Sequence, residues 1–189
     1  MSLRVFVAMP FGRKPDSTGT PIDFDRIYDE LIRPALEDAG LEVLRADEEQ
    51  DAGDIRVDLF QELLMADLVV ADLTLDNPNV WYELGVRHAL RARGVILVQG
   101  PRASQPFDIY TDRKLCYSLV DGAPDPATLA IYRKALGDMA RSTLTAWHGS
   151  KTSPVYTLLP YLQEPDWRNL RVGNAREYWE NYDAWATRI

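Results

Sequence analysis

Residues 66–91 read ADLVVADLTLDNPNVWYELGVRHALR, and this stretch holds the strand and helix that decide the fold. The apolar run DLVVADLT at 67–74 predicts a buried strand, and residues 79–91 predict a helix. Between them, Asn77, Pro78 and Asn79 predict a turn whose last residue is a helix N-cap. The predicted strand, turn and helix together indicate one strand-turn-helix unit of an α/β protein.

The same alternation continues on both sides of this unit. Strands are predicted at 3–9, 41–46, 94–99 and 114–120, and helices at 24–39, with a kink or restart at Pro34, and at 54–66. The composition of residues 12–21 predicts a flexible loop. Because parallel strands need crossover helices, the pattern predicts a Rossmann-like (flavodoxin-like) α/β fold, with a five-stranded parallel sheet and helices on both faces.

Length and the C-terminal pattern predict one domain with an extension. The 189 residues suit an α/β domain at 1–148 that ends in a helix at 125–147, followed by a helical C-terminal extension at 149–189. We expect this extension to pack on the domain or on a neighbouring subunit. Its aromatic stripe of Tyr178, Tyr182 and Trp185 favours core packing, with a docking face for a partner as the alternative.

Composition excludes several classes of function. The formal net charge of −8 disfavours nucleic-acid binding, and no apolar run approaches the about 18 residues of a membrane span, so we expect a cytoplasmic protein with no membrane partner. Cys116, in the apolar stretch LCYSL, is expected to be a buried free thiol. With two histidines in the chain and His88 expected on a helix surface, we expect no metal site.

Several motifs are also missing from the sequence. No GxGxxG follows the first strand and no GxxxxGK[ST] occurs, which disfavours a dinucleotide-dependent dehydrogenase or an NTPase, and no cofactor is expected. No GxSxG occurs, which disfavours a serine hydrolase.

Ligands of open parallel sheets bind beyond the carboxyl ends of the strands. There Asp72 ends a predicted strand, with Thr74 on the same side, and Glu83 lies near the start of the next helix. Two carboxylates in one cleft suit glycosidic cleavage, since one attacks or stabilises the anomeric carbon while another group protonates the leaving base. The alternative is an ordinary i, i+4 pair between Glu83 and Arg87. Gly85, costly inside a helix, predicts close approach to the sheet or to a ligand.

Residues of this stretch resemble the nucleoside 2-deoxyribosyltransferase superfamily. The resemblance lies in Ala66-Asp67, in Val70-Ala71-Asp72-Leu73 and in Tyr82-Glu83-Leu84-Gly85 followed by His88-Ala89. Together with VFVAMPFG and PFDI, the chain from about 4 to 120 is similar to the deoxyribosyltransferase-like domain of apoptosis signal-regulating kinases and of bacterial signalling or defence proteins. The resemblance implies a nucleophile at Glu83 and a substrate contact at Asp72.

One departure from the family pattern bears on catalysis. Where the transferases commonly carry an acid six positions before the glutamate, this chain has Asn77, which leaves Asp76, Asp72 or Asp108 as candidate proton donors. Arg13, Lys14 and Arg45 are candidates for reaching phosphate or ribose. The remaining candidate substrate-binding residues are Met9, Pro10, Phe11, Gly12, Thr74, Asp76, Asn77, Asn79, Phe107 and Asp108.

The sequence therefore predicts an N-glycoside hydrolase or transferase whose small-molecule partner is a nucleoside, nucleotide or NAD-like compound. Two alternatives stay open: a nucleotide-binding sensor module without turnover, and an interaction domain that uses the aromatic tail. Because the resembling transferases commonly complete their pockets with a neighbouring subunit, a homodimer or larger assembly is expected. Trp81 and Tyr82 are expected to point in different directions from the helix.

Overall fold

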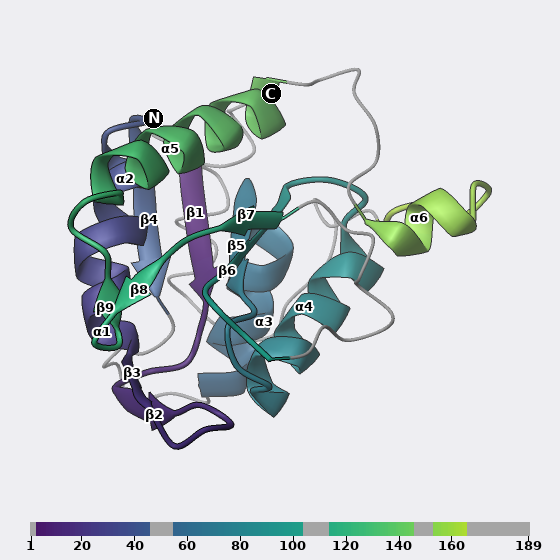
Figure 1. Ribbon diagram of the computed structural model, residues 1–189. Helices are drawn as coiled ribbons and strands as arrows, with labels where there is room; N and C mark the ends of the chain where they lie inside the picture. Colours follow the sequence, from purple (N-terminus) through teal and green to yellow (C-terminus); the bar gives the residue numbers. More distant parts are fainter. Residues whose placement is uncertain (1–2, 46–54, 104–113, 146–152, 166–189) are drawn as a thin grey trace.

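The computed structural model describes residues 3–45, 55–103, 114–145 and 153–165, without the side chains of residues 55–58. A five-stranded parallel sheet forms its centre, with strand order β4-β1-β5-β6-β7 (Figure 1). Its strands are β1 (Leu3–Ala8), β4 (Leu41–Arg45), β5 (Leu68–Asp72), β6 (Val95–Gln99) and β7 (Lys114–Cys116). This order confirms the predicted Rossmann-like, flavodoxin-like fold.

Helices cover the sheet on both faces. The helical segments are α1 (Phe24–Ile27), the π-helical turn η1 (Tyr28–Ile32), α2 (Arg33–Glu37), α3 (Ile55–Met65), α4 (Pro78–Leu90), α5 (Leu129–Thr145) and α6 (Pro154–Leu158). The predicted helix 24–39 ends at Glu37 and contains a π-turn that finishes two residues before Pro34, because proline cannot donate the hydrogen bond that a regular α-helix needs there. Gly40 follows with a φ of +82°, as expected for the end of a helix.

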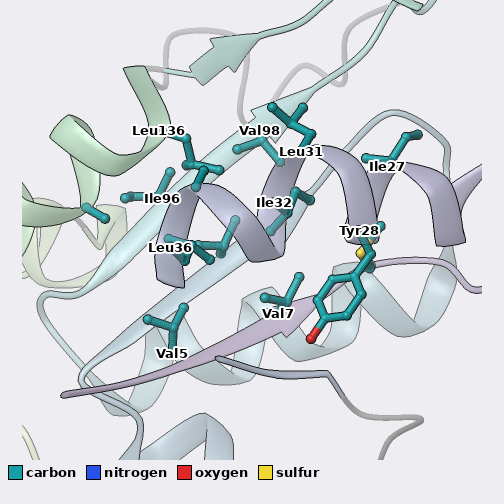
Figure 2. Close-up of a cluster of buried hydrophobic side chains, with 14 of the residues drawn as sticks. Val5, Val7, Ile27, Tyr28, Leu31, Ile32, Leu36, Ile96, Val98 and Leu136 are labelled. Atoms are coloured by element: carbon teal, nitrogen blue, oxygen red, sulfur yellow. The ribbon is translucent and has the colours of Figure 1, made fainter. Parts of the chain in front are cut away.

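Two apolar clusters form the core, one on each face of the sheet. In the first, strand residues such as Val70 and Val98 pack against the helical segment 24–37 and α5, as Figure 2 shows for Val98, Leu31 and Leu136. In the second, Ala71 and Leu97 pack with Leu84 of α4 and with residues of α3. Strand residues alternate between the two clusters, so each strand side chain can be assigned to one face.

Two predicted segments differ in the structure. Residues 12–21 form no simple loop but an antiparallel hairpin of β2 (Arg13–Pro15) and β3 (Pro21–Asp23), whose turn Asp16 stabilises with its own side chain. The predicted strand 114–120 is two strands, since β8 (Leu119–Val120) leaves the main sheet and pairs with β9 (Ala123–Pro124).

Edge position also explains why Cys116 is exposed rather than buried. Strand β7 is the last strand of the sheet, and its Leu115 packs against the first cluster, so Cys116 points to the opposite face. The prediction for His88 is wrong in the opposite direction, because its side chain is buried and does not lie on the helix surface.

The described part of the C-terminal extension packs on the end of α4. The Ser153 hydroxyl donates to the carbonyl of His88 at 2.7 Å, and the Tyr156 hydroxyl donates to the carbonyl of Ala89 at 2.8 Å. Both bonds satisfy carbonyls of the last helical turn, which have no partner within the helix. The aromatic stripe at 178–185 lies outside the described residues. Within those residues, no helix is long and apolar enough to cross a membrane.

Candidate functional site

Helix α4 begins one position earlier than the sequence predicts. Asn77, not Asn79, is the N-cap, and its side-chain oxygen accepts from the backbone N–H of Asn79 at 2.9 Å and of Val80 at 3.4 Å. Pro78 takes the first helical position, where its missing N–H costs nothing. The amide oxygen of Asn77 is therefore engaged in capping, and Asn79 is exposed.

Glu83 is a buried carboxyl group on the side of α4 that faces the core. Its side chain is 8% exposed, and it shares this side of the helix with Val80 and Leu84. Among the described residues it has no hydrogen-bond or ion-pair partner. Burial raises its pKa from 4.5 to about 7, because the charged form loses solvation and gains no compensating donor. A carboxyl group in this state is typical of functional sites.

The predicted ion pair between Glu83 and Arg87 does not form. Arg87 is fully buried, and its guanidinium donates to four backbone carbonyls, those of Leu63 at 2.8 Å, Ala66 at 2.9 Å, Gly94 at 3.1 Å and Arg93 at 3.2 Å. These bonds join the end of α3 to the start of β6. The i, i+4 interpretation of Glu83 is therefore wrong, because Arg87 has another structural role.

The raised pKa of Glu83 predicts a pH effect on stability. Because the folded state holds the proton more tightly than the unfolded state, this group's contribution is fully present below about pH 4.5 and is lost as pH rises through about 7. Glu83→Gln removes this loss, so relative to the wild type the variant should gain about 3 kcal/mol between pH 4.5 and pH 8. Urea unfolding at both pH values measures the change. A constant difference between the two proteins would show that Glu83 titrates normally.

Asp72 occupies the other face of the sheet. It pairs in register with Val98 and alternates with Val70, so its side chain points toward the cluster that contains α5. It is fully buried, and it accepts from the backbone N–H of Thr74 at 2.9 Å and from the hydroxyl of Tyr117 at 2.7 Å. Burial raises its pKa, while these hydrogen bonds act in the opposite direction.

Asp72 belongs to a closed network that joins three strand ends. The Thr74 hydroxyl lies 2.8 Å from the Tyr117 hydroxyl, and it accepts from the backbone N–H of Gly100 at 2.8 Å. Each carboxyl oxygen of the buried Asp72 thus already accepts a hydrogen bond within the protein. The structure thus brings Asp72 and Thr74 together with Tyr117, while Glu83 lies on a helix packed against the opposite face.

Tyr117→Phe tests how much this hydrogen-bond network contributes to the free energy of unfolding. Removing the hydroxyl leaves the buried Asp72 with one donor fewer, so we expect a loss of about 1–3 kcal/mol of unfolding free energy. Urea denaturation measures it, with Tyr132→Phe as the control, because the Tyr132 hydroxyl lies 3.1 Å from the Ser118 hydroxyl in a partly buried place. Equal losses in the two variants would contradict a special role for Tyr117.

The loop after β1 meets the end of β4. Arg45 is 8% exposed and donates to Asp25 at 3.1 Å, and its guanidinium lies 4.3 Å from the ring centre of Tyr28 and 5.6 Å from that of Phe11. The backbone N–H of Gly12 also donates to Asp25, at 3.1 Å. This arrangement holds the half-exposed Phe11 beside a cation at the carboxyl edge of the sheet.

The other predicted residues are divided between core and surface. Met9 packs in the first core cluster and Pro10 is buried. Arg13 pairs with Asp23 at 2.8 Å on the surface, and Lys14 is exposed. Phe107 and Asp108 lie outside the described residues.

Arg102 was missed by sequence reasoning. It donates to the carbonyl of Leu73 at 2.6 Å and to Asp76 at 2.7 Å, and its side chain is 6% exposed. Asp76 is itself mostly exposed, and its described partner is this arginine. No local signal links residues 76 and 102, because their contact depends on the packing of two loops. Tyr117 was missed for the same reason.

Two further expectations concern α4, and a third concerns metal binding. Trp81 is partly buried and packs on the second cluster, whereas Tyr82 is exposed with its ring 6.0 Å from that of Phe60, so the two point differently, as predicted. The expected close approach at Gly85 is wrong for the sheet, because a Cβ there would meet nothing within 4 Å. Among the described residues, no group of His, Cys, Asp or Glu side chains could hold a metal ion.

Comparison with family models and with curated proteins finds no match for this sequence. Among solved structures, the chain is similar to the CMP N-glycosidase BcmB of Clostridium botulinum, with 18% identity and a TM-score of 0.40. The match covers 72% of this chain and 97% of that chain.

Proposed function

We propose that the chain binds a nucleoside or nucleotide at the carboxyl edge of the sheet and cleaves its N-glycosidic bond, with Glu83 as the nucleophile. The observation that carries this proposal is the burial of Glu83 without a cationic or hydrogen-bonding partner among the described residues. Such a group costs folding free energy, and an anomeric carbon that develops positive charge would supply the missing partner. The resemblance in the sequence independently points to the same residue.

The proposed reaction has two steps, through a covalent bond between the sugar and Glu83. The ionised Glu83 carboxylate forms a bond to the anomeric carbon while the carbon–nitrogen bond breaks, and the base leaves with the electron pair and takes up a proton. Water, or an acceptor base in a transferase, then attacks the anomeric carbon as the bond to Glu83 breaks, and its proton returns to the group that protonated the leaving base. Because the nucleophile must be ionised, the rate should rise with pH through about 7, where Glu83 loses its proton.

Asp72 has a supporting role in this proposal. Its carboxyl oxygens already accept from Thr74 and Tyr117, so it fixes the strand ends beneath the ligand and does not itself react. Asp76, held by Arg102 at the surface, is the described candidate for giving a proton to the leaving base. Asp108 remains the other candidate.

The experiment that tests this function measures release of free base from nucleosides, nucleoside monophosphates and NAD. We expect at least one compound to yield free base with the wild-type protein and none to do so with Glu83→Gln. If no compound yields base with the wild type, the catalytic proposal fails.

A second candidate is a nucleotide-binding sensor without turnover. The observation that favours it is that Asn77, which stands where the resembling transferases have an acid, caps α4 and offers no proton. Ligand-induced stabilisation without product would support this candidate. We further propose a cytoplasmic homodimer or larger assembly, and the exposed apolar residues Leu158, Leu159, Tyr161 and Leu162 offer surface for it.

A further inference from the structure

Gln99 ends strand β6 on the face that α4 covers. Val95 and Leu97 pack in the second cluster with Leu84 of α4, and Gln99 follows them by the two-residue alternation of a strand. Its side chain is 4% exposed. Gln99 and Glu83 therefore belong to the same side of the sheet, whereas Asp72 belongs to the other.

One side-chain atom of Gln99 is buried without a hydrogen-bond partner among the described residues. This atom is Oε1, the acceptor of the carboxamide. The backbone is satisfied, because the Gln99 carbonyl accepts from the N–H of Tyr117 at 2.9 Å. An amide buried in this way costs about 1–3 kcal/mol, which a bound group can recover.

The strand beside Gln99 is exposed on the face that Gln99 occupies. The register neighbour of Gln99 on β7 is Cys116, which is exposed, so this face of the sheet is open one strand away. On the opposite face, the polar groups at the strand ends form the closed network of Asp72, Thr74 and Tyr117. Of the polar side chains that end β5 and β6, Gln99 is the one that the described protein leaves unsatisfied.

We propose that the Gln99 carboxamide binds the nucleobase of the ligand that Glu83 attacks, with Oε1 accepting from an exocyclic amine of the base. This inference rests on the proposed function and names a specificity residue for it. A carboxamide presents an acceptor beside a donor, which complements the amine and ring nitrogen of adenine or cytosine. A sugar hydroxyl is the other source of a donor, and the experiment distinguishes the two.

The test compares binding of AMP and CMP with binding of IMP and UMP, which carry a carbonyl in place of the amine. All proteins carry Glu83→Gln so that no ligand is consumed, and calorimetry measures the dissociation constants. We expect AMP or CMP to bind at least about 10-fold more tightly than its carbonyl counterpart. Adding Gln99→Leu should remove this preference and leave IMP and UMP binding within about 3-fold.

Gln61→Leu is the matched control. The Gln61 Nε2 atom is also buried and finds no partner among the residues that are described, but it lies within helix α3 and not at a strand end. Both leucine variants should melt at or above the temperature of their parent, because each removes an unsatisfied polar group. Gln61→Leu should keep the preference for the amine.

The possible outcomes distinguish base recognition by Gln99 from sugar recognition by Gln99 and from failure of the proposed function. If the Gln99→Leu protein binds AMP and CMP as tightly as its parent does, Gln99 has no role in base recognition. The proposed function would then still stand. The Gln99→Leu protein could instead bind all four nucleotides more weakly by the same factor and no longer distinguish CMP from 2′-deoxy-CMP. This result would overturn base recognition and show that the amide binds a sugar hydroxyl. If the parent binds no nucleotide and the wild type releases no base, the proposed function falls and this inference falls with it.

Discussion

Glu83→Gln is expected to lower the rate of base release by about 10³-fold or more, because the amide cannot form the bond to the anomeric carbon. The substitution keeps the size of the side chain and removes its charge. Since the wild-type carboxyl is buried and has no partner in the part of the chain that the structure describes, the variant should fold at least as well at neutral pH. Loss of activity would therefore reflect chemistry and not unfolding.

The control for this measurement is Glu37→Gln, which removes a carboxylate from an exposed i, i+4 pair with Arg33 on α2. It should retain the full rate. Steady-state assays with a base-releasing substrate, run from pH 5 to pH 9, measure both variants. A Glu83→Gln protein within about 10-fold of the wild type would exclude Glu83 as the nucleophile.

Arg87→Met should cost about 3–5 kcal/mol of unfolding free energy, the largest stability effect that we predict. Methionine fills most of the space but leaves four backbone carbonyls without the guanidinium donors that join α3, α4 and β6. Arg87→Lys should recover less than half of the loss, because one ammonium group cannot reproduce the planar fork. Urea denaturation at pH 7 measures both variants.

Arg33→Met provides the matched control on the protein surface. Arg33 forms an exposed i, i+4 pair with Glu37, so its loss should cost about 0.5 kcal/mol or less. If Arg87→Met were as mild as Arg33→Met, the buried guanidinium would not be joining the elements it contacts.

The parts of the fold that follow from local pattern could be predicted. The runs that became β1, β5 and β6 are apolar because both faces of a parallel sheet are buried, and alternation with helices then fixes the class of fold. The end of a helix at Gly40 and the disturbance before Pro34 also follow from backbone chemistry within a few residues. These features need no knowledge of distant contacts.

The contacts of the candidate site could be predicted less well, because they join residues distant in sequence. Tyr117 reaches Asp72 across 45 positions, and Arg87 reaches Leu63 across 24. The i, i+4 spacing predicts an ion pair between Glu83 and Arg87, but the Arg87 guanidinium donates to four backbone carbonyls instead. The error at Asn77 was local, since Pro78 at the first helical position identifies the residue before it as the cap.

The most direct test of the account is the mass of a trapped intermediate. A nucleotide with fluorine at the 2′ position disfavours positive charge at the anomeric carbon and so slows release of the sugar from the enzyme. After incubation with such a nucleotide bearing a base that the enzyme releases, the intact mass should rise by one glycosyl group. Peptide mapping should place the group on Glu83. Release of base with no adduct on Glu83, or an adduct on another residue, would contradict the account.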